Sequence, residues 1–145
     1  MADLKSLDGW DGGQHPVRVF VYGTLKPGCC YYPHYCADRV LEEQPAQVRG
    51  QLFHLSLGYP AITEGDQWVK GYLLSFRDAS ELAVLDELED YDPQRPTAKN
   101  LYDRTWVDVF DRESQPLGSA WIYRMAAATV TRLGGIWIPS GEWRP

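Results

Sequence analysis

The chain has 145 residues, of which 44% are hydrophobic and 23% charged, as expected for one globular domain with a sizeable core. Its net charge of −6 and lack of a basic block argue against electrostatic binding to nucleic acid. No stretch approaches the roughly 18 consecutive apolar residues of a membrane span, and the first residues do not form a signal peptide. We therefore expect a cytoplasmic protein that binds neither nucleic acid nor membranes. The sequence makes no prediction of its oligomeric state.

Cysteine and histidine usage favours neither a disulfide framework nor a metal site. The cysteines are Cys29, Cys30 and Cys36, an odd number in a chain without an export signal. We interpret them as buried or half-buried free thiols. The three histidines stand singly in the sequence, so no set of metal ligands is predicted.

The first elements are a strand and a short helix. Residues 1–15 are rich in Gly and Asp, and we expect a loose arm there, before a single domain of residues 16–145. The run "VRVFVYG" (17–23) is continuous and β-rich, which predicts a central strand buried on both faces. A short helix is predicted within residues 31–40.

Strands are predicted to follow in the middle of the chain. Residues 46–62 favour one or two strands, with a break at Gly58-Tyr59-Pro60. The segment "EGDQ" (64–67) is typical of a hairpin turn, and "WVKGYLLSF" (68–76) predicts the next strand.

The hydrophobic period then changes to that of a helix over residues 78–90, "DASELAVLDELED". Asp78 is positioned to cap this helix, and Glu81, three residues later, predicts a capping box. The polar residues 91–100 include prolines and predict a loop.

The last part of the chain predicts a pair of strands and an irregular tail. Alternation predicts strands at 101–110 and 119–125, joined by a turn at 111–118. The tail 134–145 is rich in Gly, Pro and Trp and is expected to wrap the body as loop or short strand. The predicted fold class is α+β, with a small mixed, barrel-like sheet and flanking helices.

One acid falls on the apolar face of the predicted helix. Glu89 shares a helical stripe with Leu82 and Leu85, whereas Glu87 and Asp90 point to solvent. Burial and the nearby helix C-terminus both disfavour a negative charge, so they raise the carboxyl pKa towards that of a general base near neutral pH. The alternative is that the whole acidic run is a solvated face and that Glu89 swings out to water.

The first strand ends in a turn with the sequence "VFVYGTLKPG" (19–28). A phosphate-binding loop is excluded, because Cys29-Cys30 stand where Lys and Ser or Thr would be needed. The backbone N–H groups of Gly23, Thr24 and Leu25 could instead hold a carboxylate or a developing oxyanion. The alternative is that Gly23 only permits a backbone conformation and that Tyr22 only packs.

Taken together, these segments resemble the gamma-glutamylcyclotransferase-like family, which includes the AIG2-like proteins. The likeness spans residues 17–143 and its motifs occur in the family's order. These motifs are "VFVYGTLKPG", "GYPAI", "VKGYLLSF", "LDELEDY", "YDRTWVDVF", "AWIYR" and "IPSGEW".

The resemblance implies a fold, a reaction and a site. The fold would be a small mixed barrel with flanking helices. The reaction would cyclise a gamma-glutamyl group of a small molecule to 5-oxoproline and free the attached amine, with no metal or organic cofactor. Glu89 matches the family's acid/base. The residues implied to bind substrate are Tyr22, Gly23, Thr24, Leu25 and, on a late strand, Tyr123.

Two positions and two alternative functions qualify this likeness. Asp90 stands where the family usually has Gly, so its side chain could narrow or recharge the pocket rim. Arg104 is interpreted as part of a structural ion pair rather than as a catalytic residue. A non-catalytic protein that binds a small carboxylate or amine is the alternative function. A scaffold role would use Trp137, Trp143 and Pro145 of the tail, although these residues are better explained as a cover for the barrel.

Overall fold

The computed structural model describes residues 16–96 and 99–145, so the arm predicted for residues 1–15 lies outside the described residues. Strands predominate, and three helices are interspersed among them. In chain order the elements are β2 (Val17–Val21), α1 (Tyr32–Tyr35), β3 (Val40–His54), β4 (Pro60–Phe76), α2 (Ser80–Leu88), β5 (Asp103–Phe110), β6 (Pro116–Arg124), α3 (Ala127–Arg132) and β7 (Ile136–Trp137).

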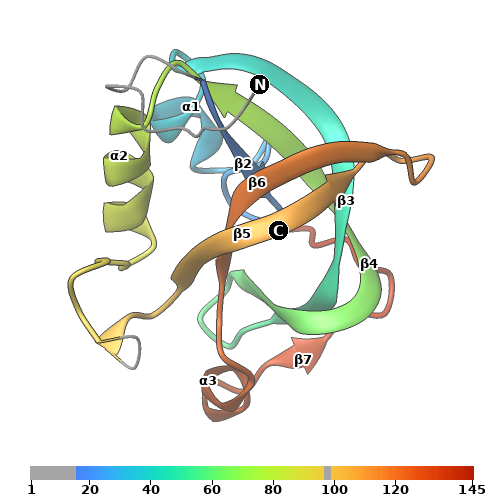
Figure 1. The fold of residues 1–145 in the computed structure, drawn as a ribbon. Helices are drawn as coiled ribbons and strands as arrows, with labels where there is room; N and C mark the ends of the chain where they lie inside the picture. Colours follow the sequence, from blue (N-terminus) through green and yellow to red (C-terminus); the bar gives the residue numbers. More distant parts are fainter. Residues whose placement is uncertain (1–15, 97–98) are drawn as a thin grey trace.

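The strands form one mixed sheet that closes on itself. Their order is β4-β2-β6-β5-β3-β7, and a further pairing of β4 with β3 completes a ring of five strands. Strands β2 and β6 run parallel, whereas the other pairs are antiparallel. Figure 1 shows α2 outside this ring. The predicted α+β class with a mixed, barrel-like sheet and flanking helices is confirmed.

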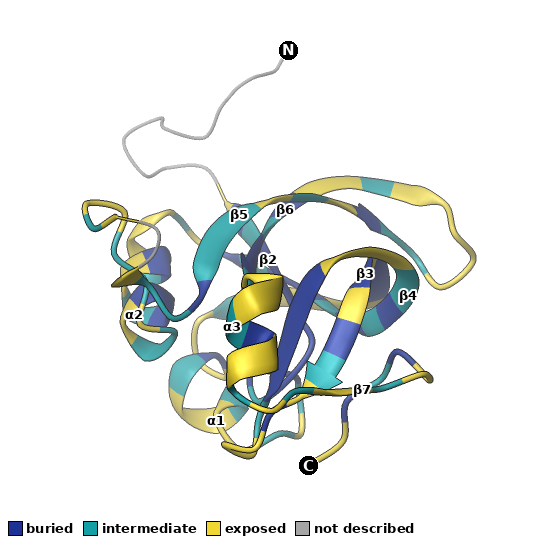
Figure 2. Ribbon diagram, turned by 90° about the horizontal axis from the view of Figure 1, so that it is seen from below, coloured by how far each residue is buried: buried dark blue, intermediate teal, exposed yellow. Residues whose placement is uncertain are grey.

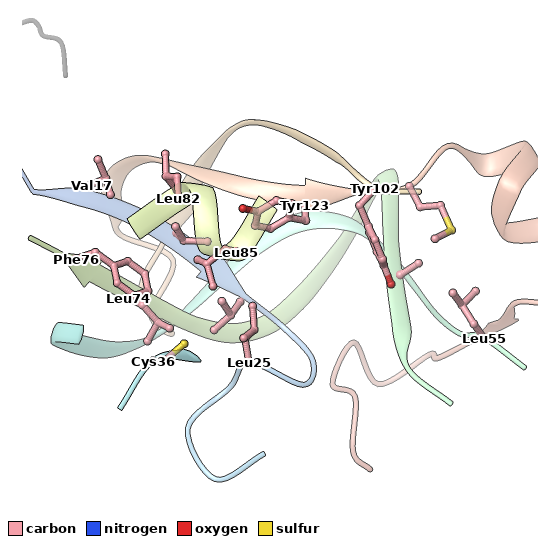
Figure 3. Close-up of a cluster of buried hydrophobic side chains, with 14 of the residues drawn as sticks. Val17, Leu25, Cys36, Leu55, Leu74, Phe76, Leu82, Leu85, Tyr102 and Tyr123 are labelled. Carbon is pink, nitrogen blue, oxygen red and sulfur yellow. The ribbon is translucent and has the colours of Figure 1, made fainter. Parts of the chain in front are cut away.

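Strand β2 lies between β4 and β6 and is buried on both faces, as predicted. Val17, Val19 and Val21 belong to a cluster that also contains the apolar face of α2. Phe20 and Tyr22 belong to a second cluster, formed with side chains of β3, β4 and β6. Figure 3 shows the first cluster, in which the helix side chains lie against the strands. Strand β2 thus connects two cores and ends at the turn predicted to bind substrate.

The prediction of a hairpin turn at 64–67 is wrong. Strand β4 continues through this segment, and its pairing with β3 passes from Gly50–Gln67 to Gln51–Thr63. The three residues in between bulge out of the ladder and are exposed. A solvent-exposed bulge favours the same small and polar residues as a turn, which explains the error. The strand break predicted at Gly58-Tyr59-Pro60 falls at the actual connection between β3 and β4.

The helix is present, but the predicted capping box is not. Helix α2 begins at Ser80, and the Asp78 carboxylate accepts hydrogen bonds from the Ser80 backbone N–H (3.0 Å) and hydroxyl (2.5 Å). The Glu81 carboxylate lies 3.7 Å from the Arg39 guanidinium. The helix starts two residues later than predicted, so Asp78 closes a local turn before it and Glu81 is left to pair elsewhere.

The remaining elements differ from the predictions at the start of β3 and near residue 130. Strand β3 begins at Val40, earlier than the strand predicted from residue 46. Helix α1 falls within 31–40, and β5 and β6 form the predicted pair of strands. The sequence predicts no element where α3 lies, because α3 is short and buries only Val130. Figure 2 shows that most of α3 is exposed. Within the described part of the chain, no helix has the length and apolar character needed to cross a bilayer.

The C-terminal tail packs against the sheet, as predicted. Its Ile138 backbone N–H donates to the Leu52 carbonyl (2.8 Å), and the Lys70 N–H donates to the Gly141 carbonyl (2.7 Å). Trp143 is 2% exposed and belongs to the second cluster. The tail therefore completes the core between β3 and β4.

Candidate active site

The turn after β2 presents backbone donors for which the described residues provide no acceptor. The Lys26 N–H donates to the Gly23 carbonyl and the Tyr31 N–H to the Thr24 carbonyl, each at 3.0 Å. The carbonyl groups of Gly23 and Thr24 are therefore engaged in hydrogen bonds that close the turn. Among the described residues, the N–H groups of Gly23, Thr24 and Leu25 have no recorded acceptor. These three donors are available to a bound molecule.

Glycine is required at position 23 by close packing. A Cβ atom at Gly23 would lie 2.5 Å from Cγ and 2.9 Å from Cδ of Pro60, the first residue of β4. Gly23 does not have a positive φ angle, so a left-handed backbone is not the reason for glycine at this position. Its role in the fold is to let the turn lie directly against the start of β4.

The turn forms one wall of a pocket of about 150 Å³. The pocket is lined mainly by aromatic and aliphatic side chains, and Glu89 provides the only charged side chain among the described residues that line it. All six residues that the sequence predicted for the site line this pocket, whereas their individual roles remain predictions. The lining residues from the rest of the chain include Tyr31, Tyr59, Pro60, Leu88, Leu101 and Tyr102.

Glu89 is placed in the pocket by the end of α2. It follows the last helical residue, Leu88, and its N–H still donates to the Leu85 carbonyl (3.0 Å). The residue is half-buried, and its carboxyl group has no hydrogen-bond partner among the described residues. Burial raises the pKa of Glu89 from 4.5 to about 7. The side chain can therefore both accept and release a proton near neutral pH.

Asp90 turns the chain away from the pocket. Its φ angle is 54°, and the Asp90 and Tyr91 N–H groups donate back to the carbonyls of Glu87 (3.2 Å) and Asp86 (2.9 Å). This is a Schellman motif, in which the left-handed residue is usually Gly. The Asp90 carboxylate lies 3.1 Å from the Arg95 guanidinium. Asp90 is not among the residues that line the pocket, and its effect on the pocket rim stays a prediction.

Three tyrosine hydroxyls fix the walls of the pocket. The Tyr22 hydroxyl donates to the Tyr123 carbonyl and the Tyr102 hydroxyl to the Pro60 carbonyl, both at 2.6 Å. The Tyr123 hydroxyl donates to Oδ1 of Asp86 (2.7 Å). Burial raises the pKa of all three tyrosines, so they stay protonated at neutral pH. Their hydroxyl groups hold the strands and turns around the pocket together.

Asp86 holds the pocket residue Tyr123 from outside the pocket lining, and the sequence analysis did not identify it. It is only 9% exposed, and its Oδ1 accepts from the Tyr123 hydroxyl and from Nε of Arg104 (2.8 Å). The guanidinium of Arg104 also lies over the rings of Trp121 (4.5 Å) and Tyr91 (5.3 Å). The structural ion pair predicted for Arg104 is therefore the one with Asp86. The signal was available, because Asp86 lies on the same helical face as Leu82, Leu85 and Glu89.

The cysteines take no part in this pocket. Cys29 is half-buried and Cys36 is buried, as predicted, whereas Cys30 is exposed; all three are free thiols. Burial raises the pKa of Cys36 to about 12, so its thiol is protonated at neutral pH. Within the described residues, no group of three or more His, Cys, Asp or Glu side chains is arranged to hold a metal ion.

The protein is thus a small α+β protein whose mixed sheet closes into a ring, with the Glu89 carboxyl group and the turn after β2 in one pocket. The sequence model of the family described as gamma-glutamyl cyclotransferase, AIG2-like, matches residues 19–145. This chain belongs to that family.

One curated relative and several solved structures are similar to this chain. A protein of Halalkalibacterium halodurans, with the provisional name gamma-glutamylcyclotransferase, is 34% identical over 98 residues, or 66% of this chain and 79% of the relative. The crystal structure of an AIG2-like protein from Mus musculus has a TM-score of 0.64 at 21% identity, covering 90% of this chain and 97% of that one. The solution structure of YtfP from Escherichia coli has a TM-score of 0.58 at 27% identity, covering 88% and 96%. These structures share the fold described above.

Proposed function

We propose that this protein is a gamma-glutamyl amine or peptide cyclotransferase. Its substrate is a small molecule in which an amine or amino acid is attached to the γ-carbonyl of a glutamyl group. The α-nitrogen of that group bonds to its own γ-carbon, and the γ-carbon–nitrogen bond then breaks. The products are 5-oxoproline and the freed amine. Family membership and the name of the bacterial relative support this reaction class.

The observation that carries the proposal is the carboxyl group of Glu89, which lines the pocket and has no partner in the part of the chain that the structure describes. An ammonium group cannot attack a carbonyl, so a base must first take its proton. Glu89 is the only charged side chain lining the pocket among the described residues, and its pKa of about 7 suits that exchange. Once protonated, the same side chain gives its proton to the departing nitrogen. General acid–base catalysis of this kind contributes roughly 10²–10⁴-fold to the rate.

The proton balance of this reaction needs neither water nor a cofactor. The α-ammonium starts with three protons and the ring nitrogen of 5-oxoproline keeps one. The other two end on the freed amine, which leaves as an ammonium ion. One of these two is the proton carried by Glu89.

The turn after β2 is proposed to stabilise the transition state. As the γ-carbonyl becomes tetrahedral, its oxygen gains negative charge. The backbone N–H groups of Gly23, Thr24 and Leu25, which have no acceptor within residues 16–96 and 99–145, are suited to hold such an oxyanion. They lie in the same pocket as Glu89. No charged side chain is then needed for this step.

The aromatic walls are proposed to hold the glutamyl chain in a folded shape. Cyclisation is intramolecular, so the pocket contributes by keeping the reacting nitrogen and carbon close together. The glutamyl group would occupy this pocket, and the departing amine would extend outwards. Tyr22 and Tyr123, held by hydrogen bonds at 2.6 and 2.7 Å, are rigid surfaces for this purpose.

The alternative function is a non-catalytic protein that binds a small carboxylate or amine on the same fold. A panel of gamma-glutamyl amides separates the two: a free dipeptide, a glutathione-like tripeptide and a gamma-glutamyl-linked lysine. Each is incubated with the purified protein, with and without a chelator, and 5-oxoproline is quantified by chromatography. The proposal predicts release from at least one amide at a rate the chelator does not change. Binding of the panel without release of 5-oxoproline would support the alternative.

A further inference from the structure

Lys26 links the turn of the pocket to the C-terminal tail. Its backbone N–H donates to the Gly23 carbonyl (3.0 Å) and so closes the turn. Its side chain is buried, with 7% of the residue exposed, and Nζ donates to the Trp143 carbonyl (2.6 Å). One residue therefore closes the turn and attaches it to a segment from the other end of the chain.

The tail is a rigid attachment point because several bonds hold its backbone. The Gly141 carbonyl accepts from the Lys70 N–H (2.7 Å). The Gln67 side-chain amide donates to the carbonyls of Ile138 (2.7 Å) and Pro139 (3.0 Å). These bonds come from β4, which also begins at the wall of the pocket.

Trp143 itself is fixed through its side chain. Its indole N–H donates to Nδ1 of His54 (3.0 Å), and its ring is packed in the same cluster as Phe20 and Tyr22. The Trp143 carbonyl that receives the ammonium group of Lys26 is therefore held in place by buried packing. A buried ammonium requires such a partner, since its desolvation is otherwise costly.

We propose that Lys26 is a positioning residue, which holds the Gly23–Leu25 donors in place by anchoring the turn to the C-terminal tail. The inference rests on the proposed function only where it concerns turnover. Lys26 does not line the pocket, so it acts through the turn and does not touch the substrate. Loss of the anchor would loosen the donors that meet the developing oxyanion, so it would lower kcat more than it raises KM.

The first test replaces the ammonium group with an apolar group of similar length, in Lys26→Met. Lys70→Met is the matched control, because its side chain makes no hydrogen bond or ion pair among the described residues. Hydrogen exchange is followed at the Lys26 and Tyr31 amides, which donate to the turn's carbonyls. The Leu74 amide, in the ladder with β2, reports global unfolding. We expect exchange at the two turn amides to be about tenfold faster in Lys26→Met than in wild type and unchanged in Lys70→Met. Exchange at the Leu74 amide should be the same in all three proteins.

The second test moves the tail without altering Lys26. Gly141 has a φ angle of +73°, and a Cβ atom there would lie 2.1 Å from the Trp68 carbonyl oxygen, so Gly141→Ala must shift the tail. Gly118→Ala is the control, since Gly118 also has a positive φ (+96°) but its Cβ would meet only the end of the Arg18 side chain. We expect Gly141→Ala to reproduce the faster exchange seen in Lys26→Met.

The third measurement is steady-state turnover of the gamma-glutamyl amide that the wild-type protein cleaves fastest. We expect kcat to fall about ten- to hundredfold in Lys26→Met and Gly141→Ala, with KM changed less than threefold. Unchanged exchange at the turn amides would overturn the anchor, whatever the activity. Faster exchange with unchanged kcat would overturn the positioning role. If the wild-type protein releases no 5-oxoproline, the proposed function fails, and the exchange data still decide whether Lys26 anchors the turn.

Discussion

The carboxyl group of Glu89 and the backbone of Gly23 line the same pocket, although they lie on different elements and far apart in the sequence. Neither the Glu89 carboxyl nor the Gly23 N–H has a hydrogen-bond partner among the described residues. A pocket in which an acceptor and a donor both lack partners among the described residues is suited to bind a polar molecule. The predictions below follow from this arrangement.

The pH dependence of turnover should report the pKa of Glu89. The base must be ionised to accept a proton, and burial raises its pKa to about 7. We therefore predict that kcat/KM rises with pH up to about 7 and levels off above it. Initial rates of 5-oxoproline release between pH 5 and pH 9 provide the test. An acid limb near pH 4.5, the ordinary range of a glutamate, would contradict the assignment.

Stability should depend on pH through the same carboxyl group. The pKa of Glu89 is higher in the folded protein than in the unfolded chain, so the folded state holds this proton more tightly. The stabilisation is complete below pH 4.5 and is lost as the pH rises through about 7. Glu89→Gln imitates the protonated form, so we predict a gain of about 1–3 kcal/mol over wild type at pH 8 and no difference at pH 4. Urea unfolding at both pH values measures it, with the exposed Glu87→Gln as a control that should show no such gain.

The Asp86 carboxylate should contribute more to the free energy of unfolding than the Tyr123 hydroxyl, which donates a hydrogen bond to it. Asp86→Ala removes the partner of both Arg104 and Tyr123 and leaves a mostly buried guanidinium without its carboxylate. We predict a loss of about 3 kcal/mol for this change. Tyr123→Phe removes only one hydrogen bond and should cost about 1 kcal/mol. Equal losses in urea unfolding would mean that the ion pair contributes nothing beyond the hydroxyl bond.

The contact between the turn and β4 should not tolerate a methyl group. Gly23→Ala would place Cβ 2.5 Å from Pro60, so the two segments must separate. We predict a loss of stability of about 1–3 kcal/mol together with a fall in kcat. Gly28→Ala is the control in the same loop: its φ is +88° but no atom lies within 4 Å of the added Cβ. It should lose about 1 kcal/mol and keep its turnover. Normal activity in Gly23→Ala would show that the turn's position is not critical.

The sequence predicted those parts of the site that depend on local pattern. A helical period is a local property, so it placed Glu89 on the same face as Leu82 and Leu85 before any packing was known. The strand that leads into Tyr22 was likewise evident from its continuous apolar run. The aromatic lining was only partly predicted, because Tyr31, Tyr59 and Tyr102 come from loops and strand ends with no shared pattern.

What the sequence did not predict depends on contacts between distant segments. Glycine is needed at position 23 because Pro60, at the start of β4, leaves no room for a Cβ atom. The partners of Asp86 lie on β5 and β6. The bulge of β4 at 64–66 resembles a turn in composition, and only its pairing with β3 distinguishes the two. The helical period places Asp86 on the same face as Leu82 and Leu85, but its bonds to Arg104 and Tyr123 depend on strands that the period does not describe.

The decisive comparison is the rate of 5-oxoproline release by Glu89→Gln and by Glu87→Gln, measured beside the wild-type protein on the amide that it cleaves fastest. Glutamine keeps the shape of the side chain but cannot take up a proton at neutral pH. We predict that Glu89→Gln folds normally by circular dichroism and loses about 10²-fold or more in kcat, whereas Glu87→Gln matches wild type. Full turnover by folded Glu89→Gln would show that the buried carboxyl group is not the base.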